Sequence, residues 1–199
     1  MRQLLVATTN PAKLREIRSV MAGVDVELLS LADVTRVEEP EENGVTFEEN
    51  ARLKALHYAE HSGLPTVAED SGLVVDALAG EPGVCSARFL RPDAAYPERF
   101  EEIWRRLSEH PGEPWTARFV AALAYVDNGR VVYETTGVVE GEIADAARGA
   151  GGFGYDPIFY YPPYGRTLAE VSESEKVRVA HRGVAFRAFA TWLRQGGLQ

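Results

Sequence analysis

LLVATTNPAK, residues 4–13, passes directly from an apolar run into a polar turn. The apolar part predicts a buried strand, and Asn10 and Pro11 are typical of the N-cap and the first position of a helix. Backbone N–H groups and the positive end of the helix dipole would then point beyond the strand, and Lys13 adds a mobile cation one turn later. These groups suit a phosphate ester, although an ordinary strand-to-helix turn uses the same residue types.

Size and charge limit the classes of protein to which the chain can belong. Its 199 residues, 45% of them hydrophobic, can bury one sizeable core or one core divided between two lobes. The formal net charge of -9 argues against a nucleic-acid partner, since such binding uses a basic surface. No apolar run approaches the ~20 residues that span a bilayer, so we expect no membrane partner. Cys85 is the only cysteine, which excludes an internal disulfide and favours a cytoplasmic location.

The first half of the chain alternates strands and helices. Hydrophobic periodicity predicts strands at 3–9, 24–29 and 65–68, and helices at 11–22 and from Thr46 to Gly63. Residues 69–72, EDSG, follow the third strand. Carboxylates at the end of a buried strand lie where α/β folds place catalytic groups, although a turn with an Asp cap fits the same residues.

The second half adds a hairpin to this pattern. We expect a helix from 97 to 108, β-rich runs at 116–126 and 130–139, and a last helix at 183–194. The two runs are joined by Asp127-Asn128-Gly129, a strong hairpin signal. The pattern predicts an α/β fold with a mixed sheet and flanking helices, in two lobes around a central cleft where a ligand would bind.

Two motif matches lie in the wrong context. GAGGFG at 149–154 fits the dinucleotide fingerprint, but no strand is expected directly before it and no helix after it. HYAEH at 57–61 fits a zinc-peptidase pattern, but its helix ends at once and no third ligand stands out. Solvent-facing histidines near a helix C-terminus explain it better. No Gly-Lys pair occurs, which excludes a Walker A loop.

Three further stretches carry candidate chemistry. The acidic loop (residues 38–43) offers oxygen ligands, although such runs are commonly solvated surface. Magnesium on a triphosphate needs only one or two protein carboxylates, for which Glu41 and Asp70 are candidates. The aromatic rings of GFGYDP at 152–157 can stack on a base, although packing into the core is their commoner role. Lys176 and HRG at 181–183 place cations near the last helix.

Together these stretches resemble the inosine/xanthosine triphosphate pyrophosphatase family, which hydrolyses non-standard purine nucleoside triphosphates. The resemblance covers nearly the whole chain. The motifs that carry it, in order, are TTNPAK at 8–13, EENG at 41–44, TF at 46–47, ENA at 49–51, KA at 54–55, DSG at 70–72, FGYDP at 153–157, Lys176 and HRG at 181–183. One difference is Glu69, where Asp is common in the family; it leaves Asp70 in place.

The resemblance implies a single two-lobed pyrophosphatase domain over residues 1–199, an elongated mixed sheet, Mg²⁺ as cofactor and a homodimer. Asp70 is then the expected catalytic base and, with Glu41, a metal ligand, while Ser71 contacts the substrate. The expected triphosphate contacts are Thr8, Thr9, Asn10, Pro11, Ala12 and Lys13. The expected base pocket consists of Phe153, Gly154, Tyr155, Asp156, Lys176, His181 and Arg182.

The implied reaction is attack of water on the α-phosphorus of ITP, dITP or XTP, which releases pyrophosphate and the monophosphate. Such chemistry consists mostly of positioning and charge neutralisation. A related pyrophosphatase for modified pyrimidines is one alternative. A non-catalytic nucleotide-binding module is another, although it has no need of a base beside a metal ligand.

Overall fold

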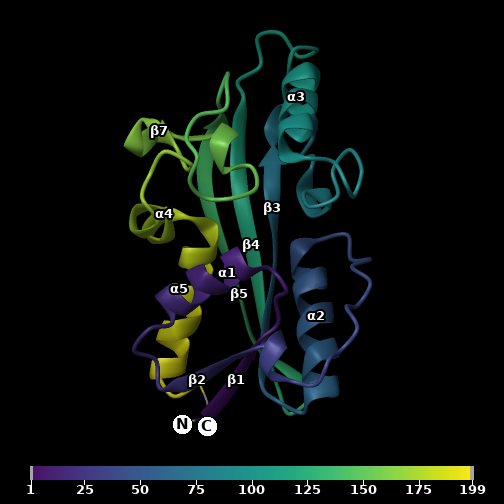
Figure 1. Cartoon of the computed structure of the whole chain (residues 1–199), viewed down its shortest axis with the longest axis vertical. Helices are drawn as coiled ribbons and strands as arrows, with labels where there is room; N and C mark the ends of the chain where they lie inside the picture. The colour runs from purple at the N-terminus through teal and green to yellow at the C-terminus, as the bar shows by residue number, and fades with distance from the viewer. Residues whose placement is uncertain (1, 198–199) are drawn as a thin grey trace. The chain divides into compact units, whose positions relative to one another are not determined.

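The computed structural model describes residues 2–197 and shows an α/β protein (Figure 1). The strands are β1 (Arg2–Val6), β2 (Val26–Ser30), β3 (Thr66–Val75), β4 (Thr116–Asp127), β5 (Arg130–Ile143), β6 (Phe159–Tyr161) and β7 (Arg166–Thr167). The α-helices are α1 (Pro11–Val20), α2 (Phe47–Ser62), α3 (Tyr96–Leu107), α4 (Glu173–Val179) and α5 (His181–Arg194). Residues 1 and 198–199 of the predicted domain lie outside the described residues.

The strands within residues 2–197 form one seven-stranded mixed sheet in the order β2-β1-β3-β4-β5-β6-β7. Strand β1 pairs in parallel with β2 and β3, whereas β6 pairs antiparallel with β5 and β7. The predicted fold class is therefore confirmed. No helix in the described part of the chain combines the length and apolar character that a membrane crossing requires.

The chain divides into two compact units that share strands. Unit 1 contains residues up to 71, 121–137 and from 181 on, and unit 2 contains 72–120 and 138–180. Strands β3, β4 and β5 each pass from one unit into the other. The single two-lobed domain and its central cleft stay predictions.

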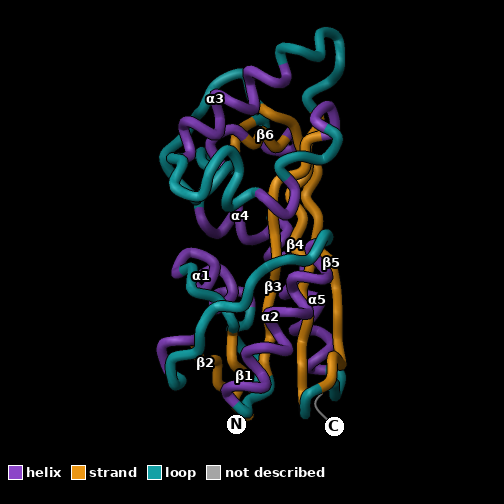
Figure 2. Tube along the Cα trace, turned by 90° about the vertical axis from the view of Figure 1, so that its right-hand side faces the viewer, coloured by secondary structure: helices purple, strands orange, loops and turns teal. Residues whose placement is uncertain are grey.

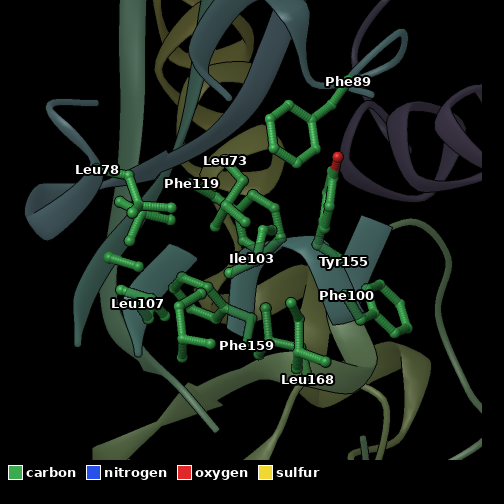
Figure 3. Close-up of a cluster of buried hydrophobic side chains, with 14 of the residues drawn as sticks. Leu73, Leu78, Phe89, Phe100, Ile103, Leu107, Phe119, Tyr155, Phe159 and Leu168 are labelled. Atoms are coloured by element: carbon green, nitrogen blue, oxygen red, sulfur yellow. The ribbon is translucent and has the colours of Figure 1, made fainter. Parts of the chain in front are cut away.

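Each unit has its own hydrophobic core. In unit 1, α1 and α5 lie side by side and bury apolar residues with β1, β3 and β4, including Ile17, Val67 and Phe186 (Figure 1). In unit 2, α3 packs Ile103 and Leu107 into the cluster that Figure 3 shows. The buried faces of these helices carry apolar residues at helical spacing, as the sequence predicted. Burial of this apolar area holds each helix against the sheet.

Local signals placed most element boundaries correctly. Asn10 caps α1 with Pro11 behind it, and the Thr46 side chain accepts a hydrogen bond from Glu49 N at the start of α2. Gly63 ends α2 in the left-handed region at φ 68°. In the predicted hairpin turn, Asn128 and Gly129 both have positive φ, at 49° and 73°. This conformation is the one that Asn-Gly turns favour.

The sequence prediction was wrong about residues 69–72. Strand β3 continues to Val75, so these residues lie inside a strand and not in a turn after it. Glu69 and Asp70 are buried but charged, and hydrophobic periodicity detects buried positions only where they are apolar. The strand could therefore not be recognised at these positions. Helix α4 and the short strands β6 and β7 were also not predicted.

Gly137 of β5 allows the strand to approach the start of α5. A Cβ atom at this position would overlap the carbonyl oxygen of His181 and lie 2.6 Å from Ala185 N. Both are backbone atoms that cannot turn aside, so β5 has room here only for a glycine.

We therefore expect Gly137→Ala to lower the free energy of unfolding by about 1–3 kcal/mol or more, the usual cost of overpacking. Val132→Ala is the control, because Val132 lies on the same strand and is 47% exposed. It should change stability by no more than about 0.5 kcal/mol. Urea unfolding of both variants checks this, and equal stabilities would contradict the close approach.

Candidate active site

The turn at residues 8–13, here called the phosphate turn, is rigid. The Asn10 side chain accepts hydrogen bonds from Ala12 N at 2.9 Å and Lys13 N at 3.3 Å, and Asn10 N donates to Thr8 Oγ1 at 3.2 Å. The Thr9 hydroxyl donates to Glu39 Oε1 at 2.9 Å, which connects the turn to the acidic loop. The N–H groups of Ala12 and Lys13, expected to be open, are thus bound to Asn10.

Lys13 was expected to be mobile, but its ammonium group is held by an ion pair. Its Nζ atom lies 2.8 Å from Glu69 Oε1, and the Glu69 side chain is only 2% exposed. Burial lowers the pKa of Lys13, and the neighbouring Glu69 carboxylate partly opposes this shift. The lysine is therefore pre-oriented on the inner side of the phosphate turn.

Arg182 lies in the same buried network. It is 1% exposed and donates from Nη1 to Glu16 Oε2 at 2.5 Å, and from Nε and Nη2 to Glu69 Oε1 at 3.1 Å. Nη2 also donates to Ser71 Oγ at 3.1 Å. Burial alone would raise the pKa of Glu69, but the Arg182 and Lys13 cations outweigh it and hold that pKa well below its ordinary value.

Asp70 points to the opposite face of β3 from Glu69, because successive side chains of a strand alternate. Its Oδ1 accepts from Lys54 Nζ at 2.9 Å and its Oδ2 from Asn50 Nδ2 at 3.2 Å. Burial raises the pKa of the Asp70 carboxyl, and Lys54 opposes the shift. A carboxylate with a raised pKa, held by two donors, is suited to accept a proton.

The acidic loop meets this site through Glu42. Glu42 Oε1 lies 3.2 Å from Lys54 Nζ, so carboxylates from the loop and from β3 converge on one cation. Burial alone would lower the pKa of Lys54, but Asp70 and Glu42 outweigh it and raise that pKa. Glu41, the predicted metal ligand, is exposed.

This donor set fits a magnesium ion. Carboxylate oxygens are the ligands that Mg²⁺ prefers, and in nucleotide sites it takes one or two of them beside water and phosphate oxygens. Two carboxylates already share the Lys54 cation, as noted above. Among residues 2–197 no cluster of three or more His, Cys, Asp or Glu is arranged to hold a metal by itself.

Five of the predicted base-pocket residues lie in unit 2, namely Phe153, Gly154, Tyr155, Asp156 and Lys176. Asp156, 2% exposed, accepts from Phe153 N at 2.7 Å and from Lys176 Nζ at 2.5 Å. Lys176 Nζ also lies 4.2 Å from the centroid of the Phe153 ring. Gly154 is in the left-handed region at φ 67°, where a glycine is favoured.

Tyr155 lies in the core of unit 2 beside Phe100 (Figure 3). The ring is 3% exposed, and the hydroxyl donates to Ser86 O at 2.9 Å. Tyr155 thus packs into the hydrophobic core, which is the commonest role of an aromatic residue, and it anchors the loop at 152–157 to that core. His181, at the start of α5 in unit 1, is also buried.

The sequence analysis gave no role to Glu16, Asn50 or Lys54. Asn50 and Lys54 are four residues apart in a predicted helix, a spacing that places both on one face and was a usable signal. Glu16 gave no such signal, because a Glu in an amphipathic helix is ordinarily on the solvent side.

The structure shows which elements contain the two motif matches. The GAGGFG segment at 149–154 is loop and turn, followed only by a 3-10 helix at Asp156–Ile158. His57 and His61 lie in the last turns of α2. His61 Nδ1 bonds to the His57 carbonyl oxygen at 2.7 Å, as expected near the end of a helix.

The network around Arg182 predicts a large stability effect. Arg182→Ala would remove the cation that pairs with the buried Glu16 carboxylate and would leave Lys13 to pair with Glu69. Breaking a buried ion pair typically costs about 3–5 kcal/mol. Arg187→Ala is a matched control, since it is the same change at an exposed position of α5 and should cost no more than about 0.5 kcal/mol. Urea unfolding distinguishes them; a similar small loss in both would show that Arg182 does not stabilise this network.

Comparisons with known proteins find matches over nearly the whole chain. Residues 4–192 match the model of the Ham1 family. The dITP/XTP pyrophosphatase of Thermus thermophilus is 47% identical over 98% of this chain and 93% of its own length, and that of Geobacter sulfurreducens is 43% identical over the full length of both. A HAM1 protein from Coxiella burnetii has a similar structure, with a TM-score of 0.92 and 37% identity over 98% of this chain and 100% of its own. The chain belongs to the Ham1 family.

Proposed function

We propose that this chain hydrolyses the non-standard purine nucleoside triphosphates ITP, dITP and XTP to the monophosphate and pyrophosphate. Curated relatives that bear the name dITP/XTP pyrophosphatase match it over nearly its full length. The structural observation that carries the proposal is the convergence of Glu42 and Asp70 on Lys54. A module that only bound nucleotides would not need a buried carboxylate with a raised pKa in that position.

We assign the catalytic role to Asp70. Its carboxylate accepts a proton from the attacking water, while Lys54 and Asn50 hold its orientation. Ser71 contacts the substrate from the adjacent position of β3. Phosphate is bound by the phosphate turn, where Lys13 already has its ammonium group fixed by Glu69.

Mg²⁺ is the proposed cofactor, held by Asp70 and by the acidic loop through Glu41, the residue predicted from the sequence, or Glu42. When bound, the ion neutralises charge on the triphosphate and polarises its phosphoryl oxygens. The chain contributes carboxylate oxygens at fixed positions. The Thr9–Glu39 hydrogen bond and the Lys54–Glu42 ion pair hold the acidic loop that carries them.

The base is read by Phe153, Gly154, Asp156, Lys176, His181 and Arg182, with Tyr155 supporting the loop. Lys176 and Asp156 form a buried pair that fixes the Phe153 ring as a stacking surface. Arg182, whose donors pair with Glu16, Glu69 and Ser71, would have to exchange one of these bonds to meet the base. With His181 it would then supply donors that suit a 6-oxo purine and leave an adenine amino group without a partner. We further propose a single two-lobed domain that acts as a homodimer in the cytoplasm.

The reaction itself is tested with a panel of nucleoside triphosphates and magnesium. We expect ITP to give IMP and pyrophosphate, because attack occurs at the α-phosphorus. Initial release of orthophosphate with accumulation of the diphosphate would exclude attack there. Faster turnover of modified pyrimidines would favour the related pyrophosphatase, and binding without turnover would favour a non-catalytic module.

Asp70→Asn tests the assignment of the base. The substitution keeps the shape of the side chain but removes its charge and basicity, so kcat should fall by ~100 to 10,000-fold while substrate still binds. Asp76→Asn is the control, since that exposed carboxylate pairs with Arg118 and should retain full turnover. An Asp70→Asn enzyme with more than about a tenth of the wild-type kcat would exclude the role.

A further inference from the structure

The histidine motif at 57–61 lies on a polar stripe of α2 that the proposed function does not explain. Asn50, Lys54 and His57 follow one another at spacings of four and three residues, which places them on the same face of a helix. His61 continues the stripe by one turn, and its ring lies 4.3 Å from the His57 ring. All four residues belong to unit 1.

This stripe meets the acidic loop at successive points. Gly44 N, directly after the loop, donates to Asn50 Oδ1 at 2.8 Å. Glu42 pairs with Lys54, and His57 Nε2 bonds to the carbonyl oxygen of Glu38 at 2.8 Å. The loop therefore runs antiparallel to α2, as the segment preceding α2 does in Figure 2.

We propose that His57 is a positioning residue for the acidic loop: its Nε2–H group holds the Glu38 carbonyl and so keeps the loop carboxylates beside Asp70. The inference rests on the proposed function, in which the loop helps to hold magnesium. His57 does not contact the reacting atoms. It acts through the backbone of the loop, on the far side of Glu41 and Glu42 from the Asn50 contact.

The hydrogen bond from His57 to the Glu38 carbonyl oxygen helps to order the acidic loop. Carboxylate-rich segments repel themselves, and a loop without regular structure loses conformational freedom when it is ordered. The Thr9–Glu39 bond and the His57–Glu38 bond both lie on the exposed surface, so the difference between them lies in how each donor is held. The His57 ring is in tilted contact with the His61 ring and meets the Tyr58 ring edge-on, and its partner is the loop backbone, so its donor is held by two neighbouring rings.

Three variants distinguish the effect of the His57–Glu38 hydrogen bond from the effect of the aromatic ring at position 57. His57→Phe keeps an aromatic ring but removes the donor, and His57→Gln keeps an N–H group near the position of Nε2. His61→Phe is the matched control, because the same change one turn later removes only a bond to the backbone of α2. Thermal unfolding of all three establishes that they fold.

The first readout is hydrogen exchange of residues 38–44 in the protein without substrate or metal. We expect faster exchange in His57→Phe, with near wild-type exchange in His57→Gln and His61→Phe. The second readout is the magnesium concentration that gives half-maximal hydrolysis of ITP. It should rise about threefold to tenfold in His57→Phe, the effect of losing one hydrogen bond, while kcat at saturating magnesium is unchanged.

Each outcome is decisive. Equal hydrogen-exchange rates of residues 38–44 in His57→Phe and His61→Phe would contradict the proposal that His57 restrains the loop. Exchange in His57→Gln as fast as in His57→Phe would contradict it as well. Faster exchange with an unchanged magnesium requirement would overturn the link between the restraint and the metal. Because exchange is measured without turnover, the restraint is tested even if the chain proves inactive on ITP, so failure of the proposed function is distinguishable.

Discussion

The ion pairs around Arg182 constrain unit 1 more than any other contact described. A guanidinium group that is 1% exposed has lost its hydration, so the fold requires carboxylates to replace water. Glu16 comes from α1 and Glu69 from β3, and Arg182 itself from α5. The three elements must therefore meet in one arrangement, since a shift of any of them would leave a charge buried alone. Hydrophobic packing brings α1 and α5 to the sheet, and this network selects their register.

Lys13 extends the network to the phosphate turn. Its ammonium group is oriented by Glu69, which is oriented in turn by Arg182. In the proposed function, the cation for phosphate is thus placed by the same charges that stabilise the helices. Structural and binding roles share one carboxylate, so they cannot be altered independently.

Elements defined by local chemistry could be predicted from the sequence. The Asn10 cap, the Gly63 helix end and the turn at Asn128-Gly129 depend on a few adjacent residues and were placed correctly. The length of β3 could not be predicted, because buried charges at 69 and 70 resemble a loop until their partners are known. Those partners lie far along the chain; Arg182 is 113 positions from Glu69.

The alternation of β3 has a consequence for how this protein can vary in length. Glu69 joins the ion network on one face, and Asp70 meets Lys54 on the other. A one-residue insertion or deletion between Gly63 and Ala68 that the strand absorbed would exchange these faces. Glu69 would then face Lys54 of α2. Asp70, whose side chain is shorter, would face Arg182 without reaching it. This connection therefore tolerates a change in length only if the added residue stays outside the strand.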